Sequence, residues 1–72
     1  RPTGRLLVAG GNSAAVYLDG RRVAVTPATL PAVTVGEHVV EVRDGSRVAR
    51  RTVTIAAGRS TYIELAPGGG TR

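Results

Sequence analysis

The sequence predicts an all-β fold, a small antiparallel β-sandwich of about six to seven short strands. Apolar and polar residues alternate with a period of two along most of the chain, as they do in strands with one buried face. Turn-forming pairs such as Asp19-Gly20 and Asp44-Gly45 interrupt this alternation at spacings of about 8–12 residues, which is typical of sandwiches. No window repeats its apolar residues with the period of a helix.

The extended segments of the first half of the chain are short and are separated by Gly or Pro. They comprise residues 5–9, 14–18, 23–25 and 33–35. The pair Asp19-Gly20 closes the second segment, because both residues tolerate the backbone angles of a tight turn. Thr26-Pro27 stops the third segment, because proline cannot donate a hydrogen bond to a neighbouring strand. We expect residues 26–31 to be irregular, with Leu30 turned inward.

The second half of the chain predicts a β-hairpin, whose turn is Asp44-Gly45, and a final strand after Ala57-Gly58. The extended segments comprise residues 37–43, 48–55 and 59–65. Aliphatic side chains at alternate positions of the extended segments should face inward and form the core. They are Leu6, Val8, Val16, Leu18, Leu30, Val40, Val42, Val53, Ile55, Ile63 and Leu65.

Composition limits both the size of this fold and the chemistry it can carry. A chain of 72 residues forms one domain with one core, which must be aliphatic because Val, Ala, Leu and Ile supply almost all of the apolar side chains. Cys is absent, which excludes disulfides and thiolate zinc sites, and a single His cannot form a cluster of imidazole ligands. No stretch approaches about 18 consecutive apolar residues, so we expect no direct membrane insertion of this segment.

We divide the chain into an N-terminal extension at residues 1–3, a β-sandwich domain at 4–66 and a Gly-rich C-terminal tail or linker at 67–72. The chain starts with Arg rather than Met, and it ends in a Gly-rich stretch. We therefore expect a module that belongs to a longer polypeptide.

Several motifs follow one another in a characteristic order along the chain. They are Gly4-Arg5-Leu6-Leu7-Val8, Ala15-Val16-Tyr17-Leu18-Asp19-Gly20, Thr26-Pro27 and Gly36-Glu37-His38-Val39-Val40-Glu41-Val42. In this order and spacing they resemble the PEGA domain family, and the resemblance extends from Gly4 to Leu65. The Pro-Glu-Gly-Ala tetrapeptide that names the family is replaced here by residues 12–15, at turn positions.

The resemblance implies a PEGA-like β-sandwich of the Ig-like kind that lies outside the cytoplasm, at the cell surface or in the periplasm. Such modules are attached to larger bacterial proteins, and surface-layer-like proteins and membrane-anchored Ser/Thr kinases are typical hosts. The resemblance further implies a non-catalytic accessory module without a cofactor, which would serve as a structural, spacer or protein-interaction domain.

We assign structural roles to the residue types that could serve catalysis or metal binding. His38 is the one candidate general base, and it shares a face with Val40 and Val42, which predicts a partly buried His hydrogen-bonded to nearby backbone. No Ser, Cys or carboxylate lies at a spacing that would make it a catalytic partner of this His. We therefore predict no enzyme and no catalytic, cofactor-binding or metal-binding residue. The residues assigned to turns and core are Asp19, Gly20, Thr26, Pro27, Gly36, His38, Val40, Val42, Asp44 and Gly45.

The candidate interaction surface consists of Arg and Tyr side chains that should point outward. They are Tyr17, Arg21, Arg22, Arg43, Arg47, Arg50 and Tyr62. The formal net charge of +5 suits a polyanion partner, but all ten basic residues are Arg, a bias that GC-rich coding sequence also produces. Surfaces that bind nucleic acid usually interleave more aromatic residues. We therefore expect another protein or a cell-envelope component as the partner rather than nucleic acid.

Two alternative functions remain open. Residues 23–25 and 33–35 are short, apolar and bordered by Pro, so they are candidate edge strands for self-association. The chain would then be the repeating subunit of a self-assembling surface layer or filament. The second alternative is a basic module that binds a polyanion, either a wall polymer or nucleic acid.

Overall fold

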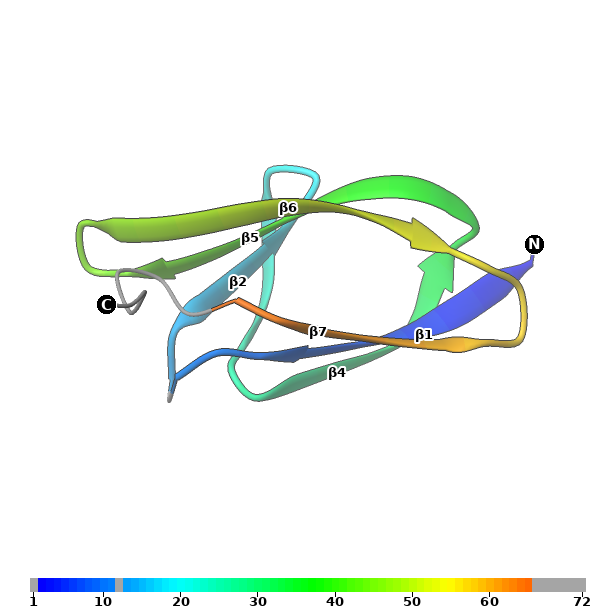
Figure 1. Ribbon diagram of the computed structural model, residues 1–72, viewed down its shortest axis with the longest axis horizontal. Coiled ribbons are helices and arrows are strands. Elements are labelled where there is room, and N and C mark those ends of the chain that lie inside the picture. The colour runs from blue at the N-terminus through cyan, green and yellow to red at the C-terminus, as the bar shows by residue number, and fades with distance from the viewer. Residues whose placement is uncertain (1, 12, 66–72) are drawn as a thin grey trace.

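The computed structural model describes residues 2–11 and 13–65, which form seven strands in two facing sheets (Figure 1). The strands are β1 (Thr3–Ala9), β2 (Ala15–Leu18), β3 (Arg21–Val25), β4 (Ala28–Thr34), β5 (Gly36–Asp44), β6 (Arg47–Ile55) and β7 (Ser60–Glu64). One sheet has the order β4-β1-β7 and the other the order β3-β2-β5-β6. The described residues contain no helix, and the predicted all-β sandwich is confirmed. The predicted C-terminal tail at 67–72 lies outside the described residues.

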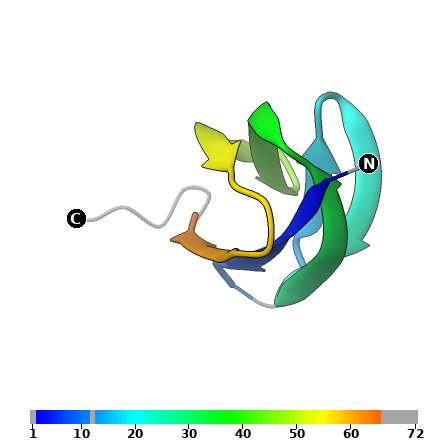
Figure 2. The ribbon, with the colours of Figure 1, turned by 90° about the vertical axis from the view of Figure 1, so that its right-hand side faces the viewer.

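Antiparallel pairing dominates both sheets, and within the described part of the chain the one parallel pair is that of β1 and β7. The predicted hairpin is present as β5 and β6, which pair continuously from Gly36 opposite Ile55 to Asp44 opposite Arg47. Its turn contains Gly45 at a φ of 64°, a left-handed conformation that glycine adopts without steric cost. Viewed from one end, the strands surround a common interior (Figure 2).

The prediction of an irregular segment at 26–31 holds for residues 26–27 but is wrong for 28–31, because β4 begins at Ala28 and continues through Pro31. β4 is an edge strand, so a proline with no N–H group can be accommodated there. The pairing of β4 with β1 also shifts register between Gly4 and Leu6, opposite the segment of β4 that contains Pro31. A register shift of this kind leaves a residue outside the regular hydrogen-bond ladder. Leu30 is partly buried and packs against the core, as predicted.

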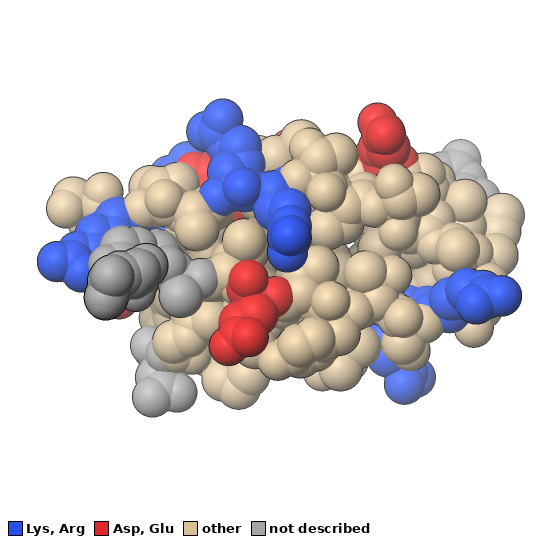
Figure 3. Space-filling model, viewed as in Figure 1, with Lys and Arg blue, Asp and Glu red and all other residues tan. Residues whose placement is uncertain are grey.

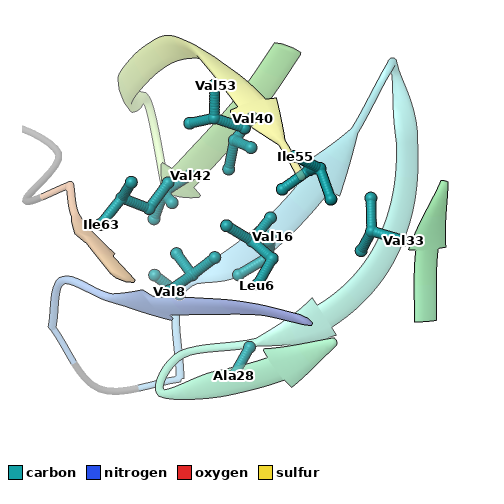
Figure 4. Close-up of a cluster of buried hydrophobic side chains, with 11 residues drawn as sticks. Leu6, Val8, Val16, Ala28, Val33, Val40, Val42, Val53, Ile55 and Ile63 are labelled. Atoms are coloured by element: carbon teal, nitrogen blue, oxygen red, sulfur yellow. The ribbon is translucent and has the colours of Figure 1, made fainter. Parts of the chain in front are cut away.

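The core lies between the two sheets and is entirely aliphatic (Figure 4). The predicted inward residues that are buried are Leu6, Val8, Val16, Val40, Val42, Val53, Ile55 and Ile63. Leu18, Leu30 and Leu65 are partly buried and pack against them. Ala14, Ala28 and Val33 complete the core without having been predicted. Strand alternation therefore identifies most of the core, because both sheets bury only one face.

Thr26, which follows β3, forms hydrogen bonds with the residues that precede β2. Its side chain is buried, and its hydroxyl oxygen accepts a hydrogen bond of 3.0 Å from the Ala14 N–H. Its carbonyl accepts a further bond from Ser13 N, and its own N–H donates to the Ala14 carbonyl. These three bonds extend the β2–β3 pairing past the ends of both strands, so this Thr position has a structural role.

Candidate interaction surface

The structure distributes the predicted interaction residues over several surfaces. Those on the outer face of the four-stranded sheet are Tyr17, Arg22, Arg43 and Arg50. Arg21 instead lines a pocket of about 390 Å³ between β3 and β4. Arg47 begins β6 beside the hairpin turn, and Tyr62 lies on β7 of the other sheet with 64% of its surface exposed. The predicted set is therefore not one continuous surface.

A row of polar side chains crosses the outer face of the four-stranded sheet. Tyr17 of β2 lies opposite Arg22 of β3 on one side and opposite Glu41 of β5 on the other. Glu41 in turn lies opposite Arg50 of β6. Residues that pair directly across neighbouring strands point to the same face of the sheet. The four strands thus contribute one residue each to a single row.

Arg43 lies two residues after Glu41 on β5 and binds two members of this row. Its Nε donates a hydrogen bond of 2.7 Å to Glu41 Oε2, and its Cζ lies 4.3 Å from the centre of the Tyr17 ring. The hydrogen bond from Arg43 is the main reason that the pKa of Glu41 lies below its ordinary value, and the charges of Arg43 and Arg50 also lower it. Glu41 is therefore ionised at neutral pH, although the residue is only 8% exposed.

A second cluster of polar side chains lies at the end of β2, around His38. Because Leu18 pairs with Val40, the next residue, Asp19, lies beside the start of β5. Asp19 Oδ1 accepts a hydrogen bond of 2.9 Å from Val39 N, and Oδ2 lies 2.6 Å from His38 Nδ1. The sequence analysis did not anticipate this contact, because the two residues are distant in sequence and the register of β2 on β5 brings them together.

The hydrogen-bond partners of His38 indicate which of its ring nitrogens carry protons. Nε2 lies 2.7 Å from the Thr34 carbonyl oxygen, which can only accept, so Nε2 donates. Nδ1 faces the Asp19 carboxylate, which also only accepts when ionised, so Nδ1 donates as well. Both nitrogens carry a proton only in the imidazolium form. Accordingly, the hydrogen bond with Asp19 raises the pKa of His38 and lowers that of Asp19, against a smaller opposing effect of burial.

The comparison with known families agrees with this architecture. The family model of the PEGA domain matches residues 10–67 of the chain. The chain belongs to the PEGA domain family. No curated protein matches it in a sequence comparison. PEGA domains are small accessory modules that are generally non-catalytic and typically extracellular.

In this PEGA domain, residues of the family motifs contact one another in the folded chain. Asp19 from the Asp-Gly turn meets His38 from the Gly-x-His strand, and Thr26 from the Thr-Pro turn binds Ala14. The motif residues are far apart in sequence, but each contact joins two neighbouring strands of the four-stranded sheet. These positions thus hold the turns and strand ends of the sheet in register.

The cluster around His38 has the residue types of a hydrolase triad but not the hydrogen bonds of one. The Thr34 hydroxyl oxygen lies 3.2 Å from His38 Nε2, and Asp19 holds the other ring nitrogen. A general base needs a free lone pair on Nε2 to accept the hydroxyl proton. Here the Nε2–H group donates a hydrogen bond to the Thr34 carbonyl, so this arrangement connects β5 to the end of β4 and leaves Nε2 no lone pair for the hydroxyl proton.

Two further features bear on binding by the PEGA domain. Within residues 2–11 and 13–65, no group of three or more His, Cys, Asp or Glu side chains could hold a metal ion. The same part of the chain includes no helix of the length and apolar character needed to cross a membrane.

Proposed function

We propose that this PEGA domain is a non-catalytic structural, spacer or protein-interaction module of a larger bacterial cell-surface protein, such as a membrane-anchored Ser/Thr kinase. The observation that carries the proposal is the family match over residues 10–67, which include all strands except β1. Accessory modules of this kind act through their surface and their dimensions rather than through a reaction centre.

The arrangement of the polar side chains supports the same proposal. Asp19, His38 and Thr26 form hydrogen bonds that stabilise turns and strand ends. The outer face of the four-stranded sheet, by contrast, presents Tyr17 and several Arg side chains to the outside. These outward side chains are thus available for contacts with another molecule.

The location in the host is tested by antibody labelling of intact and permeabilised cells that produce the full-length protein. We expect an antibody against this domain to label intact cells as strongly as permeabilised ones. Labelling that requires permeabilisation would contradict a cell-surface module.

The alternative of a self-assembling subunit has a structural basis in the edge strand β3, where Val23 and Val25 are exposed. Light scattering of the isolated chain across a wide concentration series separates the two functions. A module should remain monomeric, whereas a layer or filament subunit should grow with concentration.

A further inference from the structure

We propose that the outer face of the four-stranded sheet is a docking surface for an extended acidic segment of another protein. This face, which we call the Arg–Tyr face, is defined by Tyr17, Arg22, Glu41, Arg43 and Arg50. The inference rests on the proposed interaction function and adds to it the surface and the chemistry of the partner.

Charge is the first argument for an acidic partner. The row, together with Arg43, carries three guanidinium groups and one carboxylate, which Arg43 already neutralises. A second carboxylate of the outer face, Glu37, lies four residues before Glu41 on β5 and therefore outside the row. Arg22 and Arg50 occupy the two ends of the row, on the edge strands β3 and β6. Figure 3 shows blue Arg side chains over the β5–β6 end of the molecule and a second blue group at the opposite end. An added carboxylate would therefore find positive charge on this face without displacing an existing ion pair.

The central guanidinium, that of Arg43, is held in place before any partner binds. Arg43 uses Nε to bind Glu41 and lies against the Tyr17 ring, so its side chain has already lost much of its freedom. Its Nη groups are not used by the hydrogen bond to Glu41 and can donate to a carboxylate of a partner. A fixed donor costs less conformational entropy on binding than a freely rotating one.

Exposed valines on the same face favour a protein over a simple polyanion. Val25 pairs with Ala15, and Val48 pairs with Arg43, so both point to the Arg–Tyr face. They are 43% and 47% exposed, respectively, and Val39 on the same face is 38% exposed. Interfaces between proteins combine Tyr, Arg and apolar side chains in this way.

The position of Arg43 also argues against a nucleic acid on this face. Partners of that class stack their bases on open aromatic rings. Here the Arg43 guanidinium occupies one face of the Tyr17 ring, with its Cζ 4.3 Å from the ring centre. A base on the Arg–Tyr face would therefore compete with this guanidinium for that face of the ring.

The spacing of the row fits an extended chain laid across the strands. Arg22 and Arg50 are separated by three intervals between neighbouring strands, which corresponds to about 14 Å. Alternate residues of an extended chain lie about 7 Å apart and point to the same side. Carboxylates at alternate positions of a partner segment can thus reach both ends and the centre of the row.

The test measures fluorescence anisotropy of a labelled peptide in which Glu alternates with Thr and Val, titrated with the intact chain at low salt. The matched control peptide has Gln at every Glu position. We expect the Glu peptide to bind, and the double variant Arg22→Gln/Arg50→Gln to weaken its affinity about tenfold. The charge-matched control Arg5→Gln/Arg59→Gln alters two exposed Arg outside this face and should leave the affinity within about twofold.

A third variant tests the role of the stacked guanidinium. Arg43→Lys keeps the charge but cannot form the planar contact with Tyr17 or offer a two-pronged donor, so we expect about a fivefold loss of affinity. Far-UV circular dichroism verifies that each variant is folded. Amide chemical shifts of the labelled domain, followed by NMR on peptide addition, should change on the Arg–Tyr face.

Several results would overturn the proposal. The Arg5/Arg59 control could weaken the Glu peptide as much as the Arg22/Arg50 variant, which would show binding by overall charge. The Gln peptide could bind equally well, or single-stranded nucleic acid could bind more tightly and depend on the same three Arg side chains. Absence of binding by the Glu peptide would likewise reject an acidic partner. The cell-labelling experiment is independent of these outcomes, so failure here leaves the proposed surface module intact.

Discussion

The contact between Asp19 and His38 leads to a quantitative prediction about stability. Asp19 Oδ1 binds the Val39 N–H, Oδ2 binds His38, and the residue has a φ of 52°. The amide hydrogen bond contributes about 1 kcal/mol. The ion pair contributes about 1 kcal/mol rather than more, because the Asp19 side chain is 50% exposed. A left-handed backbone costs a residue such as Ala about 1 kcal/mol.

These contributions predict a graded series of variants. Asp19→Asn keeps an acceptor for Val39 and tolerates the backbone angle, so it should lower the free energy of unfolding by about 1 kcal/mol. Asp19→Ala loses all three contributions and should lower it by about 3 kcal/mol. Urea unfolding is followed by far-UV circular dichroism, because the chain contains no Trp. Equal losses for the two variants would contradict this assignment.

The same pair should make stability depend on pH in two ranges. The pKa of His38 is raised, so its contribution is complete below the ordinary value of 6.5 and is lost as the pH rises through the higher folded value. The pKa of Asp19 is lowered, so its contribution is complete above 3.8 and is lost as the pH falls through the lower folded value. The pair should therefore stabilise the fold most between these two ordinary values.

A double-mutant cycle isolates this pair from other titrating groups. Between pH 4 and 6, Asp19→Asn and His38→Gln should show a coupling of about 1 kcal/mol, which shrinks well above pH 6.5. A coupling near zero throughout, or one that grows with rising pH, would refute the assignment of an imidazolium to His38.

The remaining predictions concern the core, a close backbone approach and catalysis. Val40→Ala removes two methyl groups from a fully buried side chain and should lower the free energy of unfolding by about 2–3 kcal/mol. Val48→Ala, at a residue that is 47% exposed, should lower it by less than about 0.5 kcal/mol. Similar costs at both sites would contradict the sandwich core. Gly4→Ala would place a Cβ against the Ala56 carbonyl oxygen and should destabilise the fold by about 1–3 kcal/mol. An unchanged urea midpoint would show that the backbone at Gly4 has room for a methyl group. Finally, hydrolysis of p-nitrophenyl acetate should be the same for the native chain and for Thr34→Val, and a loss of rate in the variant would identify a nucleophilic hydroxyl.

Most strands of this chain could be predicted from sequence, because the alternation and the turn residues that mark them are local signals. Alternation placed Val40 and Val42 on the buried face, and Asp44-Gly45 identified the hairpin turn. The segment around Pro31 was misread, because proline usually ends a strand. Only the position of β4 at the edge of its sheet makes that proline acceptable.

The polar clusters were predictable as residues but not as contacts. Tyr17 and Arg43 were both expected on the outside, yet nothing in their spacing indicates that one stacks on the other. Asp19 and His38 were each assigned to structure, but their ion pair was missed. Both contacts depend on the order β2-β5 in the sheet and on the register of that pair.

The amino-acid sequence alone determined the all-β class, the aliphatic core and the family of this protein. These properties follow from a two-residue period and from turn residues, which are local along the chain. The tertiary structure alone decided that His38 faces a carboxylate and that Arg22, Tyr17, Glu41 and Arg50 form one row. The physical reason is that a side chain's partners across a sheet are set by strand order and register, and many registers are compatible with the same alternation of apolar and polar residues.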